Sequence, residues 1–207
     1  MKKINRKLSI AAVSLMALVG NEGFAQTANY PKAKVSFADF KGLVAEVEIQ
    51  RANRLIDLNT FLKMSQEEGV ILFDSRSDFR FDRIHLKGAK HLAFTDFTQD
   101  NLKKVIPNPE TKILIYCNNN FDGNQRDFAT KALVRFPEAG KAVETQLAAQ
   151  SKPLMMALNI PTYIHLYGYG YRNVYELDEL VKVKDPRITF EGSVVEPKAP
   201  HLPPTGK

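Results

Sequence analysis

The chain has 207 residues, a formal net charge of +6 and one cysteine, Cys117. A single cysteine excludes an internal disulfide, and the length suits one domain with its own core. The positive charge is spread out instead of forming a basic stripe, so the sequence does not indicate a nucleic-acid-binding protein.

The first 25 residues have the pattern of a secretory signal peptide. Basic residues at positions 2, 3, 6 and 7 precede an apolar run from Leu8 to Gly20, and Gly23 and Ala25 are small residues before a cut after Ala25. An uncleaved anchor is the alternative, but a spanning helix needs about 20 apolar residues. We therefore expect a protein of the periplasm or cell exterior with no stable membrane anchor. Cleavage would lower the net charge to +3.

The region before the first clear strand is less regular. Residues 26–53 are predicted to be a lead-in segment, and the stretch 35–56 fits a strand or a helix equally well. Residues 57–69 predict a helix that begins at Asp57 or Asn59 and ends at Gly69. The continuous apolar run 70–74 is typical of a buried parallel strand.

The rest of the chain alternates between helical and apolar patterns. Residues 101–106 predict a short helix, 112–116 a buried strand, 124–140 a helix, and 151–160 a helix that begins at Ser151. Residues 89–94 predict an edge strand and 162–168 a third buried strand, with an insertion at 137–150. The tail 185–207 is rich in proline and is predicted to be extended or disordered. Strands alternating with helices indicate an α/β domain with a mainly parallel sheet.

Cys117 comes directly after the predicted strand 112–116. In parallel sheets, ligands bind beyond the carboxyl ends of the strands, where loops lead into helix N-termini. Peptide N–H groups and a helix dipole at that place would stabilise a thiolate or a persulfide. The alternative is a cysteine that simply packs as a small apolar residue.

Three groups of residues carry a family resemblance. Asp74 and Arg76 are followed by Phe81 and by "HLKGA" at 85–89, with Ile84 in place of a usual glycine; "ILIYC" then ends at Cys117, and "HLYGYG" follows at 165–170. In this order they resemble the rhodanese-like (sulfurtransferase) domain family. The resemblance implies a three-layer α/β sandwich over residues 54–184, with a mainly parallel central sheet between helices.

The same resemblance implies a chemistry. Cys117 would accept sulfane sulfur as a persulfide and pass it to a thiol acceptor or cyanide, with no cofactor and no metal. The donor would be a small sulfur-containing anion, and a protein partner remains open. Asp74, Arg76 and His85 would give structural support.

The cysteine loop departs from the family pattern. Asp122 stands where active members have an arginine, and the loop is about three residues longer, so Gln125 or Arg126 reaches the arginine's place. The predicted substrate contacts are therefore Asn118, Asn119, Asn120, Phe121, Asp122, Gly123, Asn124, Gln125 and Arg126. Because of this departure, a catalytically inactive binding module is an alternative function, and phosphatase chemistry on the same fold is a third.

Overall fold

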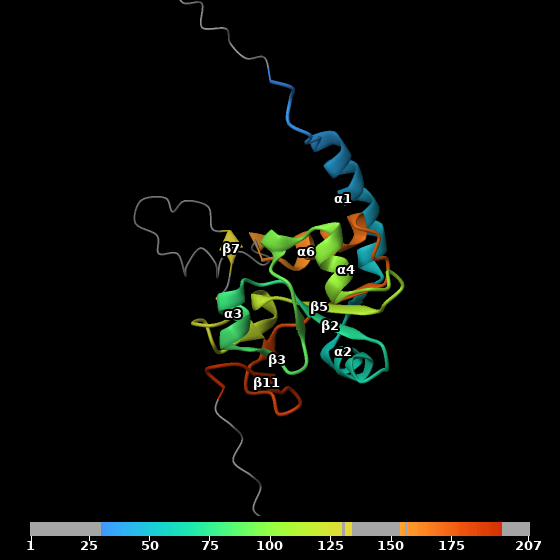
Figure 1. The fold of residues 1–207 in the computed structure, drawn as a ribbon. Helices are drawn as coiled ribbons and strands as arrows, with labels where there is room; N and C mark the ends of the chain where they lie inside the picture. Colours follow the sequence, from blue (N-terminus) through green and yellow to red (C-terminus); the bar gives the residue numbers. More distant parts are fainter. Residues whose placement is uncertain (1–29, 130, 134–153, 156, 196–207) are drawn as a thin grey trace, which may run out of the picture. The chain divides into compact units, whose positions relative to one another are not determined.

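Five parallel strands form the central sheet of the domain (Figure 1). Their order across the sheet is β1 (Leu55–Ile56), β9 (Val174–Leu177), β5 (Ile113–Tyr116), β2 (Ile71–Asp74) and β4 (Lys90–His91). The computed structural model describes residues 30–129, 131–133, 154–155 and 157–195. The predicted signal peptide lies outside these ranges. Within them, no helix is long and apolar enough to span a membrane.

The central strand β5 divides the core into two clusters. All four of its residues are buried, and consecutive side chains point to opposite faces, as the strand geometry requires. Ile113 and Ile115 join one apolar cluster, while Leu114 and Tyr116 join the other. This arrangement confirms the predicted α/β fold with a mainly parallel sheet.

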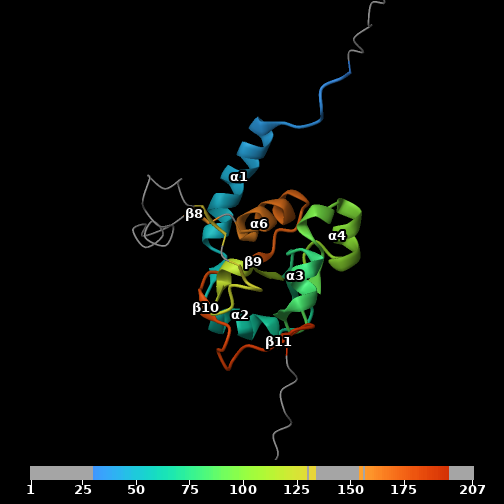
Figure 2. The same ribbon diagram turned by 90° about the vertical axis from the view of Figure 1, so that its left-hand side faces the viewer.

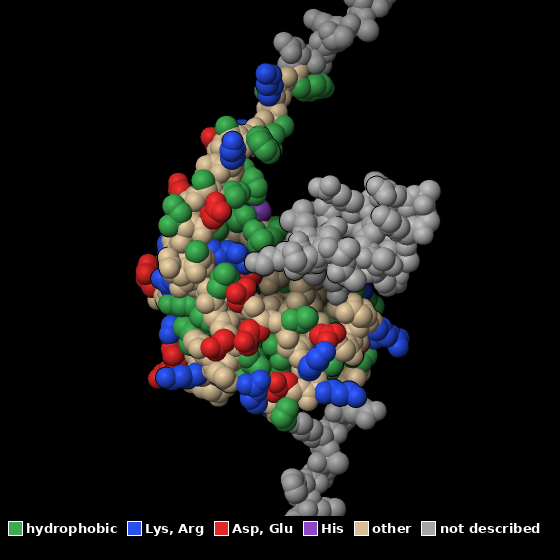
Figure 3. Space-filling model, turned by 180° about the vertical axis from the view of Figure 1, so that it is seen from behind, with side chains coloured by type: hydrophobic (Ala, Val, Ile, Leu, Met, Phe, Trp, Pro, Cys, Tyr) green, Lys and Arg blue, Asp and Glu red, His purple; other side chains and the backbone are tan. Residues whose placement is uncertain are grey.

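Three helices cover the first face of the sheet: α1 (Phe37–Ala52), α4 (Gln99–Val105) and α6 (Asn159–Gly168). Their buried members include Val47, Leu102 and Ile164. The ambiguous stretch is thus mostly helical, and Ser36 caps α1 by accepting the Asp39 N–H at 3.1 Å. Figure 3 shows apolar side chains along α1, whereas basic and acidic side chains are interspersed over much of the rest of that side.

The second face is covered by α2 (Leu58–Ser65), with Asp57 as its N-cap, and by two small sheets. Figures 1 and 2 both show α2 on the side of the sheet opposite α6. One small sheet pairs β6 (Phe121–Asp122) with β10 (Val181–Lys182); the other pairs β3 (His85–Leu86) with β11 (Phe190–Glu191). Ile188 is buried in this cluster, so residues 185–195 of the predicted tail belong to the domain.

Three predicted elements after Cys117 are wrong in the part of the chain that the structure describes. Residues 124–129, predicted to start a helix, form turns, and β7 (Ala132–Leu133) then pairs with β8 (Leu154–Met155). The Asn124 side chain accepts the Asp127 N–H at 3.1 Å, and the Phe128 N–H donates to the Asn124 carbonyl at 2.9 Å. These bonds resemble the first turn of a capped helix, but the chain does not continue it and forms β7 instead. Residues 162–168, predicted to be a strand, lie in α6, because a short apolar run does not distinguish the two structures. The expected strand is β9. The helix predicted at 151–160 is also wrong where the structure describes it, because residues 154–155 form β8 and α6 begins only at Asn159; residues 151–153 and 156 lie outside the described residues.

Candidate active site

Cys117 lies at the carboxyl edge of the sheet, directly after β5. The next three residues form the 3-10 turn η2 (Asn118–Asn120), and the Cys117 side chain is 1% exposed. Its Sγ accepts the backbone N–H of Leu158 at 3.3 Å, and Leu158 is the N-cap of α6. A helix N-terminus therefore faces the sulfur, but it belongs to α6 and not to a helix that directly continues the loop.

Burial dominates the electrostatics of the sulfur. It raises the pKa of the Cys117 thiol, because a thiolate loses its hydration in the protein interior. The backbone N–H groups of Leu158 and Asn118 act in the opposite direction and lower the pKa, but they do not overcome burial. The structure therefore holds Cys117 as a thiol near neutral pH, where the sequence suggested a thiolate.

The Cys117 sulfur borders a cavity of about 340 Å³. Three cationic side chains, Arg76, Arg80 and Lys131, contribute to its lining. The remaining lining residues are hydroxyl-bearing, amide or apolar: Ser75, Ser77, Thr95, Asn118, Ala93, Phe94, Ala129 and Leu158. A cavity with a nucleophilic atom and several cations can hold a small anion against that atom.

A buried network fixes the edge of the sheet beneath this cavity. Arg76 and Asp74 form an ion pair with Nη2 and Oδ2 at 2.7 Å, and both side chains are at most 2% exposed. The second nitrogen contact runs from Arg76 Nε to Asp74 Oδ1 at 3.0 Å, and Nη2 also donates to the Ile84 carbonyl at 2.6 Å. The Tyr116 hydroxyl donates to Asp74 Oδ2 at 2.6 Å and accepts the Leu86 N–H at 3.1 Å.

Two asparagines fasten the η2 turn. Asn118 Oδ1 accepts from Arg76 Nη1 at 3.3 Å, which ties the turn to the buried ion pair. Asn120 Oδ1 accepts the Cys117 N–H at 2.8 Å, and its Nδ2 donates to the Leu177 carbonyl at 2.7 Å. The backbone around the sulfur is thus held from both neighbouring strands, β2 and β9.

The structure distributes the other predicted contacts elsewhere. Asn119 Oδ1 accepts the N–H of Lys131 at 3.1 Å, but Asn119 itself lines a different cavity, together with Asn120. Phe121 is buried in the second core cluster, and Asp122 forms an ion pair with Lys182 on β10. None of the remaining predicted contacts lines the Cys117 cavity either: Gly123, Asn124, Gln125 and Arg126.

His85 lies away from the sulfur. Its Nδ1 is 2.7 Å from the Phe81 carbonyl oxygen, and its Nε2 is 3.3 Å from Glu191 Oε1 on β11. The imidazole also stacks on the Phe81 ring, with centroids 3.7 Å apart. These contacts join β3 to α3 (Asp78–Arg83) and to the C-terminal segment.

Sequence reasoning missed three groups near Cys117. Arg80 lies on α3, which follows β2 at the same sheet edge as Cys117. Because ligands bind beyond the carboxyl ends of parallel strands, Arg80 could have been predicted in the same way as Cys117. Lys131 and the Leu158 N–H come 14 and 41 residues after the cysteine. No local pattern in the sequence brings those two residues to the sulfur.

The comparison with protein-family models agrees with this architecture. The model of the family "Rhodanese-like domain" matches residues 57–179. Among solved structures, the chain is similar to the BH2092 protein from Bacillus halodurans, with 16% identity, 66% of this chain and 74% of that chain covered, and a TM-score of 0.32. No curated protein matches. Because the family match spans more than half of the chain, this protein belongs to the rhodanese-like domain family.

Proposed function

We propose that this protein is a sulfurtransferase that carries sulfane sulfur as a persulfide on Cys117. The observation that supports this most is the placement of the Cys117 sulfur at the border of a cavity with Arg76, Arg80 and Lys131. The cavity volume, about 340 Å³, suits a small molecule. Family membership supports a fold of the sulfurtransferase type.

The reaction balances with a donor such as thiosulfate. Cys117 first loses its proton to water, and the resulting thiolate is a minor species near neutral pH because burial raises the pKa. This thiolate attacks the outer sulfur of the donor, the sulfur–sulfur bond breaks, and sulfite leaves with the bonding electron pair. The persulfide then gives its outer sulfur to an acceptor thiolate or cyanide, and the Cys117 thiolate is restored. The N–H groups of Leu158 and Asn118 stabilise the anionic sulfur at each stage.

Two of the cations are available for the donor anion. Arg76 is committed to Asp74, whereas Arg80 uses one nitrogen for the Arg126 carbonyl and Lys131 is exposed. Asp122, which would oppose an anion, is paired with Lys182 and lies outside the cavity. Arg80 and Lys131 are therefore assigned the role that a loop-ending arginine has in active family members.

Mass spectrometry of the intact protein tests the proposal. After incubation with thiosulfate, polysulfide or a mercaptan sulfur donor, Cys117 should gain one sulfur atom, and Cys117→Ser should gain none. Lys131→Gln should slow loading by thiosulfate, while Lys182→Gln, a matched control outside the cavity, should not. A cysteine that accepts no sulfur from any donor, although it can be alkylated, would exclude sulfur transfer.

A second candidate is a binding module without turnover. The observation that favours it is the burial of Cys117 together with its raised pKa, since both reduce the reactivity of the thiol. The two functions differ in their response to Cys117→Ser. This substitution abolishes the biological effect of a sulfurtransferase, whereas a binding module keeps it.

We also propose that the protein is exported. The supporting observation is the order of basic, apolar and small residues before position 26. N-terminal sequencing of the mature protein from a periplasmic or culture fraction should begin at Gln26. An intact Met1 in the cytoplasmic fraction alone would contradict this proposal.

A further inference from the structure

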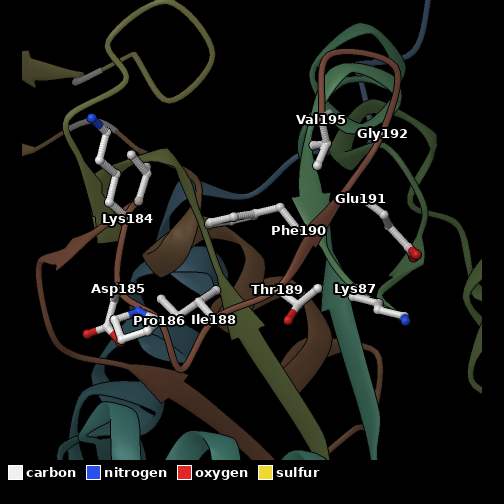
Figure 4. A pocket seen from close by; sticks show the side chains of 11 residues that line it. Lys87, Lys184, Asp185, Pro186, Ile188, Thr189, Phe190, Glu191, Gly192 and Val195 are labelled. Atoms are coloured by element: carbon white, nitrogen blue, oxygen red, sulfur yellow. The ribbon is translucent and has the colours of Figure 1, made fainter. Parts of the chain in front are cut away.

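A second cavity, of about 710 Å³, lies on the C-terminal segment of the domain (Figure 4). Its apolar lining includes Ile188, Phe190 and Val195, and Lys87 and Lys184 contribute the basic side chains. Figure 4 shows the Phe190 side chain extending across the cavity toward the side of Lys184. None of its lining residues borders the Cys117 cavity.

Backbone contacts hold the wall of this cavity in place. The Lys87 N–H donates to the Thr189 carbonyl at 2.9 Å, and the Ser193 N–H donates to the Asp82 carbonyl at 2.8 Å. Gly192 has φ +133°, and a Cβ at this position would lie 2.5 Å from the Arg83 carbonyl oxygen. The C-terminal segment therefore packs backbone to backbone on the α3–β3 region, and the cavity is formed before any ligand binds.

The charges around the cavity leave one cation without a partner. The Asp185 carboxylate accepts two hydrogen bonds from the Arg187 guanidinium, at 2.9 and 2.6 Å. The Glu191 carboxylate accepts the Gly88 N–H at 2.8 Å and lies beside His85. Among the described residues, neither Lys87 nor Lys184 forms an ion pair. The Gly88 N–H lowers the pKa of the Glu191 carboxyl most, and the charge of Lys87 also helps to lower it, whereas Lys184 has no such neighbour in the described part of the chain. The uncompensated charge at the mouth is therefore positive.

We propose that this cavity binds a small amphipathic anion, with its apolar body against Ile188 and Phe190 and its carboxylate at Lys184. Removing an apolar body from water against these side chains is favourable. The lysine can lie along the cavity rim on its apolar stem and keep its ammonium group beside the anion. A cationic ligand is disfavoured, because Asp185 is paired with Arg187, the charge of Lys87 offsets that of Glu191, and the charge of Lys184 remains positive.

Three probes with the same apolar chain, octanoate, octanol and octylammonium, separate the contribution of apolar burial from the contribution of charge. With the full-length mature protein, calorimetry should give the tightest binding for octanoate, weaker binding for octanol and the weakest for octylammonium. Amide chemical-shift changes in nuclear magnetic resonance spectra should centre on Phe190 and Gly192. Lys184→Gln should weaken octanoate binding about fivefold and leave octanol binding unchanged. Lys182 is a nearby lysine that pairs with Asp122, and Lys182→Gln should change neither octanoate binding nor octanol binding.

Several results would overturn the proposal. These results are equal affinities for octanoate and octanol, no binding of either, and shift changes that centre on another region. Analytical sedimentation of the same samples tests whether the cavity is instead covered by a second copy of this chain. A dimer that dissociates on Phe190→Ala would assign the cavity to a second copy of this chain instead of a small anion.

Discussion

Removal of one hydroxyl group should show how strongly the buried network beneath Cys117 supports the fold. In Tyr116→Phe the ring and its packing remain, but two hydrogen bonds are lost. The Leu86 N–H, which donates to this hydroxyl at 3.1 Å, and Asp74 Oδ2, which accepts from it at 2.6 Å, both lose a partner in the interior. Tyr116 is 2% exposed, so water does not replace the hydroxyl without a rearrangement.

The magnitude follows from what each partner loses. An orphaned buried N–H costs about 1–3 kcal/mol, and a lost bond to a charged group costs about 1.5–3 kcal/mol. Asp74 keeps its bonds to Arg76, which offset part of the second loss. We expect the free energy of unfolding to fall by about 3 kcal/mol. For a domain of this size that lowers the melting temperature by roughly 6–12 °C.

Tyr163→Phe is a control with the same chemical change in the other core cluster. Tyr163 is fully buried, and its hydroxyl has no hydrogen-bond partner among the described residues. Burial raises the pKa of Tyr163 to about 12, so the group stays protonated. Removing an unpaired buried hydroxyl should leave the stability within about 0.5 kcal/mol or raise it.

Urea unfolding followed by circular dichroism measures both variants. The expected result is a lower midpoint for Tyr116→Phe with an unchanged slope, and an unchanged or higher midpoint for Tyr163→Phe. Equal losses in the two variants would refute the reasoning, because the cost would then come from the ring environment and not from the hydrogen bonds.

Three further predictions concern the cysteine turn and the C-terminal segment. Because burial raises the pKa of Cys117, its alkylation rate should rise with pH to a midpoint above the ordinary cysteine value, and a lower midpoint would contradict this. The buried neutral thiol of Cys117 also contributes to the free energy of unfolding. This contribution is fully present below the pKa of Cys117 in the unfolded chain and is lost as pH rises through its pKa in the folded protein. Asn120→Ala should cost about 2–4 kcal/mol in urea unfolding and speed that alkylation, since the turn loses its bonds to Cys117 and Leu177. Gly192→Ala should lower the free energy of unfolding more than twice as much as Gly88→Ala. At Gly88 the added Cβ meets no atom, so only the positive φ matters, at a cost of roughly 1–2 kcal/mol, whereas at Gly192 the Cβ also meets the Arg83 carbonyl. Equal shifts of the melting temperature would disprove the close contact at Gly192.

The sequence was sufficient for the centre of the fold. The runs at 70–74 and 112–116 are continuous, apolar and bounded by polar residues, and both are buried parallel strands, β2 and β5. The position of Cys117 at the carboxyl edge follows from β5 alone. The Asp74–Arg76 pair was expected as support for that edge, and the structure places both residues there, buried and hydrogen-bonded.

The chain after the cysteine could not be predicted in the same way. The periodic apolar residues at 128–136 indicated a helix. Asn124 and Asp127 bond locally, and Asp127 also pairs with Arg83 at 2.6 Å. The bond within Asn124–Asp127 is of the kind that caps a helix, so it does not explain the difference. The pairing of β7 with β8, which is distant in sequence, takes the place of the predicted helix at 132–133. Contacts between residues far apart in the chain also bring Lys131 to the Cys117 cavity, and periodicity contains no information about them.

The path of the chain explains why most of the loop residues counted from Cys117 do not line its cavity. The turn η2 ends at Asn120, and the chain then leaves the sulfur to form β6 and pair with β10 before it lines the cavity again at Ala129, Lys131 and Leu158. At Leu158 the N-cap of α6 presents its N–H to Sγ. The electrostatic contribution of a helix N-terminus depends on where the helix begins in space and not on the number of residues between it and the cysteine. Substitutions at the start of α6 should therefore change the reactivity of Cys117 more than substitutions at 121–126, although the latter are nearer in sequence.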